Sequence, residues 1–251
     1  MSGDTNTSLP GVRIQVENLK KSLGGMEILR GLSFEVEAGE IFVIMGPSGS
    51  GKSVLLRHLI GLESPDHGRI LVNGHSIESP EVRSQYRMAM VFQSGALLNS
   101  LTVQENVGIY LKEHRLQTPN EIQKTVDEKL KLVGLTDIGH RYPSELSGGM
   151  RKRVAIARSL VIEPQLILYD EPTSELDPQS SGTIGKEILS LKHRIEVTSI
   201  VVSHDPELAI GIADRIAVIN EGQIIFIGTT SEFKQTKDPM IHRLLYSDFK
   251  P

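Results

Sequence analysis

Gly46-Pro-Ser-Gly-Ser-Gly-Lys52-Ser53 is the stretch that decides the fold. It follows a continuous apolar run, Ile41–Met45, typical of a strand buried on both faces. Apolar residues at helical spacing follow it, ending at Gly61. A GxxxxGKS pattern between a strand and a helix predicts a phosphate-binding loop, because glycines let backbone N–H groups point inward and the helix start adds partial positive charge. A glycine-rich turn with an accidental lysine is the less favoured alternative.

Two side chains of this loop have predicted roles beyond binding phosphate. The Lys52 ammonium is expected to reach the β- and γ-phosphates of a nucleotide, and the Ser53 hydroxyl to bind Mg²⁺. The residues predicted to bind ATP are Gly46, Pro47, Ser48, Gly49, Ser50, Gly51, Lys52, Ser53, Val54 and Gln93.

Composition narrows the function classes. The chain has 251 residues, 27 Lys and Arg against 31 Asp and Glu, a net charge of −4 and no cysteine. It therefore lacks disulfides and cysteine nucleophiles, and nothing indicates a broad basic surface for nucleic acid. Its apolar runs are far shorter than the ~20 residues that cross a bilayer, so we expect any membrane role to come through a partner. Met1 to Pro10 is polar, and we expect a disordered tip there rather than an export signal.

The order of the predicted elements indicates a single α/β domain with a helical insertion. Besides Ile41–Met45, strands are predicted at Val12–Glu17, Leu32–Glu37, Arg69–Val72, Met88–Phe92, Leu166–Tyr169, Ser199–Val202, Ile216–Ile219 and Gln223–Ile227. Helices are predicted at Thr102–His114, Pro119–Val133, Gly148–Ile162, Gln179–His193, Thr230–Gln235 and Met240–Tyr246. The first three of these helices interrupt the alternation of strands and helices.

Polar side chains follow several buried strands. Asp170 and Glu171 end the run Leu166–Tyr169, and His204 ends the run Ile200 to Val202. Because ligands gather at the carboxyl ends of parallel strands, we expect Asp170 to bind a metal-ligated water and Glu171 to act on the water that attacks the γ-phosphate. His204 could reach the same phosphate. Taken alone, an acidic pair that caps a turn would be the better interpretation of Asp170 and Glu171.

Two further sites depend on the rest of the pattern. Gln93 follows the strand Met88–Phe92, where a glutamine can touch the metal site, although an ordinary loop glutamine is the alternative. Ser147-Gly148-Gly149 begins a helix that carries four cationic residues, Arg151, Lys152, Arg153 and Arg158. Such a helix start is expected to bind an anion. A helix cap with a basic face is the alternative.

Together these residues closely resemble the ATP-binding subunits of ABC transporters, over essentially the whole chain. Residues 46–53 resemble the Walker A loop, 166–171 Walker B with its catalytic glutamate, and Gln93 the Q-loop residue. Residues 146–150 resemble the signature motif, 174–177 with Asp177 the D-loop, and His204 the switch histidine.

The resemblance implies an α/β P-loop NTPase fold with ATP and Mg²⁺ as ligands. The chain 1–251 would be one ABC ATPase domain: residues 11–93 and 164–251 form the nucleotide-binding core, with an N-terminal antiparallel β-subdomain, and 94–163 an inserted α-helical subdomain that carries the signature motif. It implies catalytic roles for Glu171, His204 and Lys52, and metal contacts through Ser53, Gln93 and, by way of a water, Asp170. A head-to-tail homodimer is also implied, in which Ser147, Gly148 and Gly149 of one copy meet the γ-phosphate held by Lys52 of the other.

A narrower resemblance is to the ATPases of Mce/Mla-type lipid transporters. It rests on Phe92 to Val107, Leu111 to His114 and Leu146 to Ala155, which includes Met150 where many ABC ATPases have glutamine. It implies phospholipid cargo, an integral membrane permease, an Mce-domain lipid-binding subunit, no nucleic acid, and a peripheral position on the cytoplasmic face of the inner membrane. An importer of a polar solute, such as an amino acid or a metal, is the alternative. A soluble protein acting on nucleic acid and a scaffold that does not hydrolyse ATP are disfavoured.

Two departures from the family pattern qualify these expectations. Leu23 occupies the position where many ABC ATPases stack an aromatic ring on adenine, so we expect weaker or differently placed adenine recognition. The chain ends soon after Tyr246, so we do not expect the dimer or regulatory contacts that some relatives make with a longer C-terminal tail.

Overall fold

The centre of the molecule is a six-stranded sheet in the order β10-β9-β3-β8-β7-β6. The computed structural model describes residues 11–245, without the side chain of Arg83. The five strands from β9 to β6 are parallel, and β10 is antiparallel to β9. The bounds are β3 Ile41–Met45, β6 Met88–Val91, β7 Leu166–Asp170, β8 Thr198–Val202, β9 Arg215–Asn220 and β10 Gln223–Thr229.

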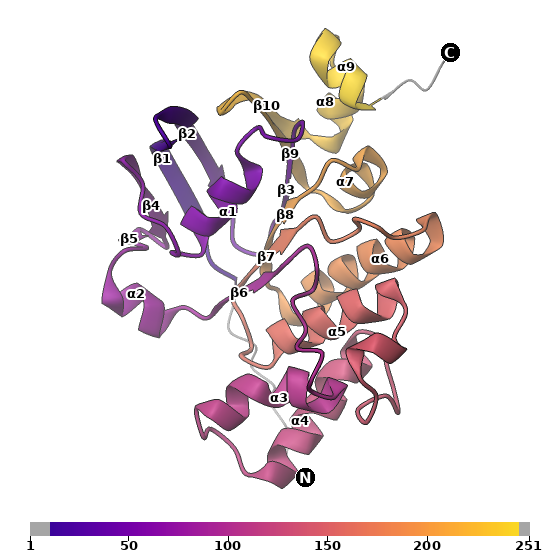
Figure 1. Ribbon diagram of the computed structural model, residues 1–251. Helices are drawn as coiled ribbons and strands as arrows, with labels where there is room; N and C mark the ends of the chain where they lie inside the picture. The colour runs from indigo at the N-terminus through magenta and orange to yellow at the C-terminus, as the bar shows by residue number, and fades with distance from the viewer. Residues whose placement is uncertain (1–10, 246–251) are drawn as a thin grey trace, which may run out of the picture.

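Each face of this sheet buries a separate hydrophobic core. Alternate residues of β3 divide between them: Phe42 and Ile44 face one core, and Ile41, Val43 and Met45 face the other. This division follows from the period of two in a strand. It explains why the run 41–45 is continuously apolar, as expected for a strand covered on both sides. Figure 1 shows strands β1, β2 and β4 with helix α1 (Lys52–Leu59) on one side and helices α3 to α6 on the other.

A four-stranded antiparallel sheet in the order β2-β1-β4-β5 lies on one side of the central sheet. Its strands are β1 Ile14–Leu23, β2 Met26–Val36, β4 His67–Val72 and β5 His75–Ser76. The predicted strands Val12–Glu17 and Leu32–Glu37 were therefore too short. Gly24 and Gly25, with φ of 57° and 83°, make a two-residue hairpin in which Leu23 pairs with Met26. Both strands continue to that hairpin.

The predicted helical insertion lies between β6 and β7. It contains α3 (Val103–Glu113), α4 (Pro119–Leu132), a short 3₁₀ turn (Pro143–Glu145) and α5 (Gly148–Leu160). Capping boxes begin α3 at Thr102 and α4 at Thr118. The fold class is thus confirmed, whereas the division at residues 94 and 163 stays a prediction. The expectations for Met1 to Pro10 and Tyr246 lie outside the described residues.

Two short helices were not predicted from the sequence, α2 (Pro80–Gln85) and α7 (Pro206–Ile212). Each begins with a capping residue followed by proline, Ser79-Pro80 and Asp205-Pro206, which is a usable helix-start signal. The remaining helices are α6 (Pro178–Ile195), α8 (Thr230–Gln235) and α9 (Pro239–Leu245). Within the described part of the chain, no helix is both long and apolar enough to span a membrane.

Candidate active site

The phosphate-binding loop connects β3 to α1 through backbone conformations that favour glycine. Gly51 is the N-cap of α1 with a φ of 100°, and Gly49 has a φ of 80°. Gly46, with a φ of 156°, also meets a steric obstacle, because a Cβ there would lie 2.2 Å from the carbonyl oxygen of Ile219. The loop therefore passes against β9 at a distance that only glycine permits.

The backbone conformation and the steric contact predict different losses in the free energy of unfolding when glycine is replaced by alanine. We expect Gly46→Ala to lower the free energy of unfolding by more than about 2 kcal/mol, because the loop must leave β9. Gly49→Ala is the matched control: nothing lies within 4 Å of its Cβ, so it bears only the left-handed conformation, about 1–2 kcal/mol. Denaturant unfolding of both variants measures the difference. Equal costs would mean that the approach to Ile219 is unimportant.

Lys52 is buried inside its own loop. Its Nζ donates to the carbonyl oxygens of Gly46 (2.8 Å) and Pro47 (2.9 Å), which uses two of its three N–H donors. Burial lowers the pKa of Lys52, and the carboxylates of Glu171 and Asp170 oppose that shift. The ammonium is therefore held at a fixed place beside two carboxylates.

Ser53 and Asp170 offer oxygen atoms of the kind that Mg²⁺ prefers. The Ser53 hydroxyl lies 3.4 Å from Oδ1 of Asp170. Burial and the neighbouring Glu171 raise the pKa of Asp170, so a bound cation would stabilise its charged form. Among residues 11–245, no group of three or more His, Cys, Asp or Glu side chains could hold a metal. The Ser53 hydroxyl, the Asp170 carboxylate and the Gln93 amide together fit a Mg²⁺ ion that is also bound by phosphate oxygens.

Glu171 and His204 are paired. Oε2 of Glu171 lies 2.8 Å from Nδ1 of His204 and accepts the His204 backbone N–H at 3.3 Å. Glu171 has a φ of 47°, a left-handed conformation that costs a non-glycine residue about 1–2 kcal/mol. Its backbone N–H donates to Val202 at the end of β8, which holds the strained peptide in place. His204 is mostly exposed, whereas the Glu171 side chain is only 13% exposed.

The predicted residues meet because Gly46, Gln93, Glu171 and His204 follow the carboxyl ends of four strands of one sheet. A cavity of about 590 Å³ lies at this edge. Gln93, Glu171 and His204 line it, together with Leu23 and Ile28. The loop and the start of α1 contribute Ser48, Gly49, Gly51, Lys52, Ser53 and Val54.

Other predicted residues take different places. Gly46 and Pro47 accept hydrogen bonds from Lys52, Ser50 is buried, and Asp170 bonds to Ser53. Ile28 was not predicted from the sequence. It lines the cavity because the Gly24-Gly25 hairpin carries β2 past the loop.

Ser147, Gly148, Gly149 and Asp177 do not line this cavity. They lie where α5 and α6 begin: Ser147 caps α5 by accepting the N–H of Met150 (3.3 Å), and Asp177 caps α6 by accepting that of Ser180 (3.0 Å). The two helix starts are closely packed, because a Cβ at Gly149 would lie 3.3 Å from the Ser180 side chain.

Each of the four cations of α5 donates to main-chain carbonyl oxygens. Arg151 donates to the carbonyl of Leu146, and Arg153 to those of Val133 and Gly134. Lys152 and Arg158 donate to carbonyls of the loop after β6. Each of the four cations thus has at least one main-chain partner, and the anion-binding hypothesis rests mainly on the helix start.

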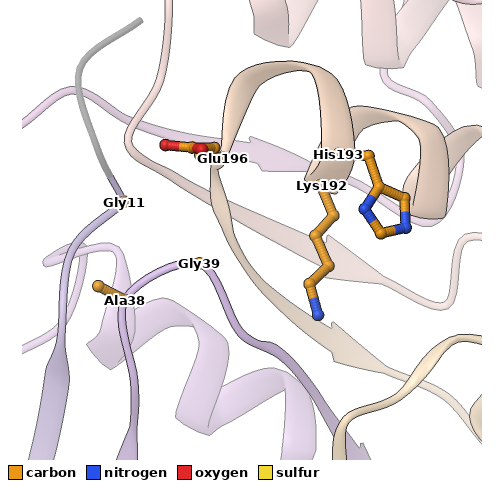
Figure 2. A pocket seen from close by; sticks show the side chains of 6 residues that line it. All are labelled: Gly11, Ala38, Gly39, Lys192, His193 and Glu196. Atoms are coloured by element: carbon orange, nitrogen blue, oxygen red, sulfur yellow. The ribbon is translucent and has the colours of Figure 1, made fainter.

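A second hollow, of about 340 Å³, lies at the opposite edge of the sheet (Figure 2). Gly39 and Glu196, which line it, precede β3 and β8, whereas the candidate site follows these strands. Figure 2 shows Lys192 and His193 on the last turns of α6, beside the turn that contains Ala38 and Gly39. The Lys192 ammonium is paired with Asp214. This hollow is separate from the candidate site.

Comparison with known proteins identifies the family. The family model described as "ABC transporter" matches residues 29–174. The sulfate/thiosulfate import ATP-binding protein CysA of Mesostigma viride is 38% identical over 92% of this chain and 66% of its own length. The probable ribonucleotide transport ATP-binding protein mkl of Mycobacterium leprae is 36% identical over 94% of this chain and 69% of its own. Protein TRIGALACTOSYLDIACYLGLYCEROL 3, chloroplastic, of Arabidopsis thaliana is 39% identical over 92% and 73%. The chain thus spans about two thirds of the length of these curated relatives.

Solved structures agree with this assignment. A nucleotide-free ATP-binding cassette from an ABC transporter superposes with a TM-score of 0.82 at 28% identity, covering 93% of this chain and 98% of that one. The dimeric post-hydrolysis state of an ATP-binding cassette with ADP and phosphate superposes with a TM-score of 0.77 at 29% identity, covering 86% and 98%. The chain belongs to the ABC transporter family and has the fold of its ATP-binding cassettes, which bind ATP with Mg²⁺ and hydrolyse it.

Proposed function

We propose that this chain is the ATP-hydrolysing subunit of a membrane transporter. The observation that carries the proposal is that Lys52, Gln93, Glu171 and His204 line one and the same cavity. A phosphate loop alone would support nucleotide binding only. A carboxylate that is held beside a histidine at the same cavity supplies a base for the attacking water.

In the proposed reaction each side chain has one task. Glu171 orients the attacking water and takes its proton, while His204 holds the carboxylate through the 2.8 Å contact. Lys52 stabilises negative charge on the γ-phosphate. A bound Mg²⁺ supplies further charge neutralisation at the phosphates, and Ser53, Gln93 and Asp170 would hold it, Asp170 by way of a water. Leu23 and Ile28 offer aliphatic surface to the base.

We further propose a head-to-tail homodimer. Ser147, Gly148 and Gly149 begin a helix, whose free N–H groups suit an anion, yet they do not line the cavity of their own copy. In the proposed dimer they meet the phosphates bound by the other copy, with Asp177 beside them. The solved cassette that is dimeric with ADP and phosphate bound supports the formation of a dimer.

The cargo we propose is lipid, moved through a Mce/Mla-type permease with an Mce-domain subunit on the cytoplasmic face of the inner membrane. The stretches from Phe92 to His114 and from Leu146 to Ala155 support this, because they resemble the ATPases of Mce/Mla-type lipid transporters. The relative named after a galactolipid also supports it. Phe92, Leu98 and Tyr110 are 41%, 48% and 41% exposed, and we assign them to the permease contact. Import of a polar solute is the second candidate, favoured by 38% and 41% identity to sulfate/thiosulfate import proteins.

One capture experiment separates these candidates. The Glu171→Gln chain is isolated from its native membranes in mild detergent with Mg²⁺-ATP, and its proteins and lipids are identified by mass spectrometry. We expect an integral permease, an Mce-domain protein and enriched phospholipid. A permease with a soluble solute-binding protein and no lipid enrichment would favour the polar-solute importer instead.

A further inference from the structure

Lys152 is a buried cation that none of the motifs above explains. It lies in the second turn of α5, and only 7% of it is exposed. Burial lowers the pKa of Lys152, against the attraction of Glu175, Glu171 and Asp170. Burying an ammonium costs free energy unless several acceptors compensate it. The arrangement of those acceptors indicates what the residue does.

The Lys152 ammonium contacts three segments that surround the site. It donates to the carbonyl oxygen of Gln93, to the Ser174 hydroxyl at 3.1 Å and to the carbonyl oxygen of Glu171 at 3.4 Å. An ammonium has three donors, which matches the three acceptors. One side chain on α5 therefore joins the loop after β6, the strained peptide after β7 and the turn that leads to Asp177.

The contact with Glu171 bears on the direction of its carboxylate. The Glu171 carbonyl also accepts the N–H of Ser174 at 3.1 Å, so two donors hold this peptide in its left-handed conformation. The backbone dihedral angles set the direction of the Cα–Cβ bond, and hence where the carboxylate lies relative to His204. Loss of the ammonium would free the peptide toward a less strained conformation.

A second cation on the same helix holds the same loop. Arg158 donates to the carbonyls of Gly95 (2.8 Å) and Ala96 (2.6 Å), next to the Gln93 carbonyl that Lys152 holds. The loop from Gln93 to Ala96 is thus fixed to α5 at two places. A displacement of α5 would displace this loop with it.

We propose that Lys152 is a positioning residue for ATP hydrolysis: it fixes the Gln93 and Glu171 peptides to α5, so that the catalytic carboxylate moves with the helix that Ser147 begins. The kinetic part of this proposal rests on the proposed function. The structural part, the fixing of the two peptides, does not depend on it.

The kinetic test compares two substitutions at the same position. Lys152→Met keeps the volume and removes the donors, whereas Lys152→Gln keeps an N–H donor and is less suited to an apolar surrounding. We expect Lys152→Met to lower kcat at least about tenfold, with KM for ATP changed less than about threefold. Lys152→Gln should retain more activity than Lys152→Met although it is no more stable to heat. A packing role predicts the opposite order of activity.

Hydrogen exchange on the purified chain tests the same idea without activity. In Lys152→Met, the amides of Gly95 and Ser174 should exchange at least about fivefold faster, because their hydrogen bonds lie in the freed segments. Arg153→Met is the matched control, since it removes a cation of the same helix that holds Val133 and Gly134. It should raise exchange at Gly134 and Leu135 instead, with kcat nearly unchanged.

The outcomes are distinguishable. Equal exchange of Gly95 and Ser174 in Lys152→Met and the wild-type chain would overturn the proposal, as would a kcat no lower than that of Arg153→Met. Absence of ATPase activity in the wild-type transporter would count against the proposed function, and hydrogen exchange would then decide the role of Lys152. If Lys152→Met does not fold, Lys152→Gln and Ser174→Ala carry the test. Their effects on kcat should be less than additive, because both act through one contact.

Discussion

Replacement of Glu171 by glutamine is expected to lower ATP hydrolysis by about 10²–10³-fold, while the affinity for ATP changes less than about threefold. Glutamine has nearly the same shape and keeps an oxygen that can accept the His204 N–H, which Glu171 accepts at 3.3 Å. It cannot take a proton from water. ATP bound to the variant should therefore persist, and the ATP-bound dimer should accumulate.

Phosphate release by the transporter complex measures ATP hydrolysis, and nucleotide binding measures the affinity for ATP. Light scattering with Mg²⁺-ATP reports the dimer. Glu163→Gln is a matched control, because Glu163 is also a glutamate with a positive φ, 48°, but precedes β7. Glu163 forms an ion pair with the half-buried Arg87 at 3.3 Å, and its own side chain is 61% exposed, so the effect of removing its charge should be small. Near-normal hydrolysis by Glu171→Gln would remove Glu171 from the proposed role.

The sequence predicted best those parts of the fold that depend on local signals. The strand Ile41–Met45 has the predicted bounds, since a strand covered on both faces must be apolar throughout. Helices α3 and α4 begin where Thr102 and Thr118 cap them. The meeting of Gln93, Glu171 and His204 at one cavity also followed from the sequence, because parallel strands share one carboxyl edge.

Features that depend on contacts between distant segments were not predictable. Nothing in the residues around Glu171 indicates that its φ is positive, because the carbonyl of Val202 and the ammonium of Lys152 hold that peptide. In the sequence, Lys152 is only one of four cations on a helix whose start is expected to bind an anion. Its neighbours in the sequence carry the same charge, so the sequence does not show which groups each cation contacts. The packing of α5 determines those contacts.

Two inactive variants are expected to restore activity when they are combined in one dimer. Lys52→Met removes the ammonium from the phosphate loop, and Ser147→Asp places a negative charge where the proposed dimer brings a phosphate. Aspartate is a good helix cap, so Ser147→Asp should preserve α5 by accepting the Met150 N–H as serine does. Each variant alone should keep less than about 5% of the wild-type activity.

The recovery follows from the way that two copies share the sites. In a head-to-tail dimer, the loop of the Ser147→Asp copy meets the unchanged Ser147 of the Lys52→Met copy, which makes one intact site. The second site carries both changes. A heterodimer isolated through two different tags, within the transporter complex, should therefore show up to about half of the wild-type phosphate release. Ser147→Asn, which caps without charge, controls for the loss of the hydroxyl.

The converse heterodimer makes the test decisive. A copy that carries both Lys52→Met and Ser147→Asp, paired with a wild-type copy, has one change in each shared site and should be inactive. If each copy instead formed its site from its own Lys52 and Ser147, this heterodimer would keep about half of the activity and the first heterodimer would have none. The two arrangements thus give opposite results with the same substitutions, so differences in folding or expression cannot imitate the expected outcome.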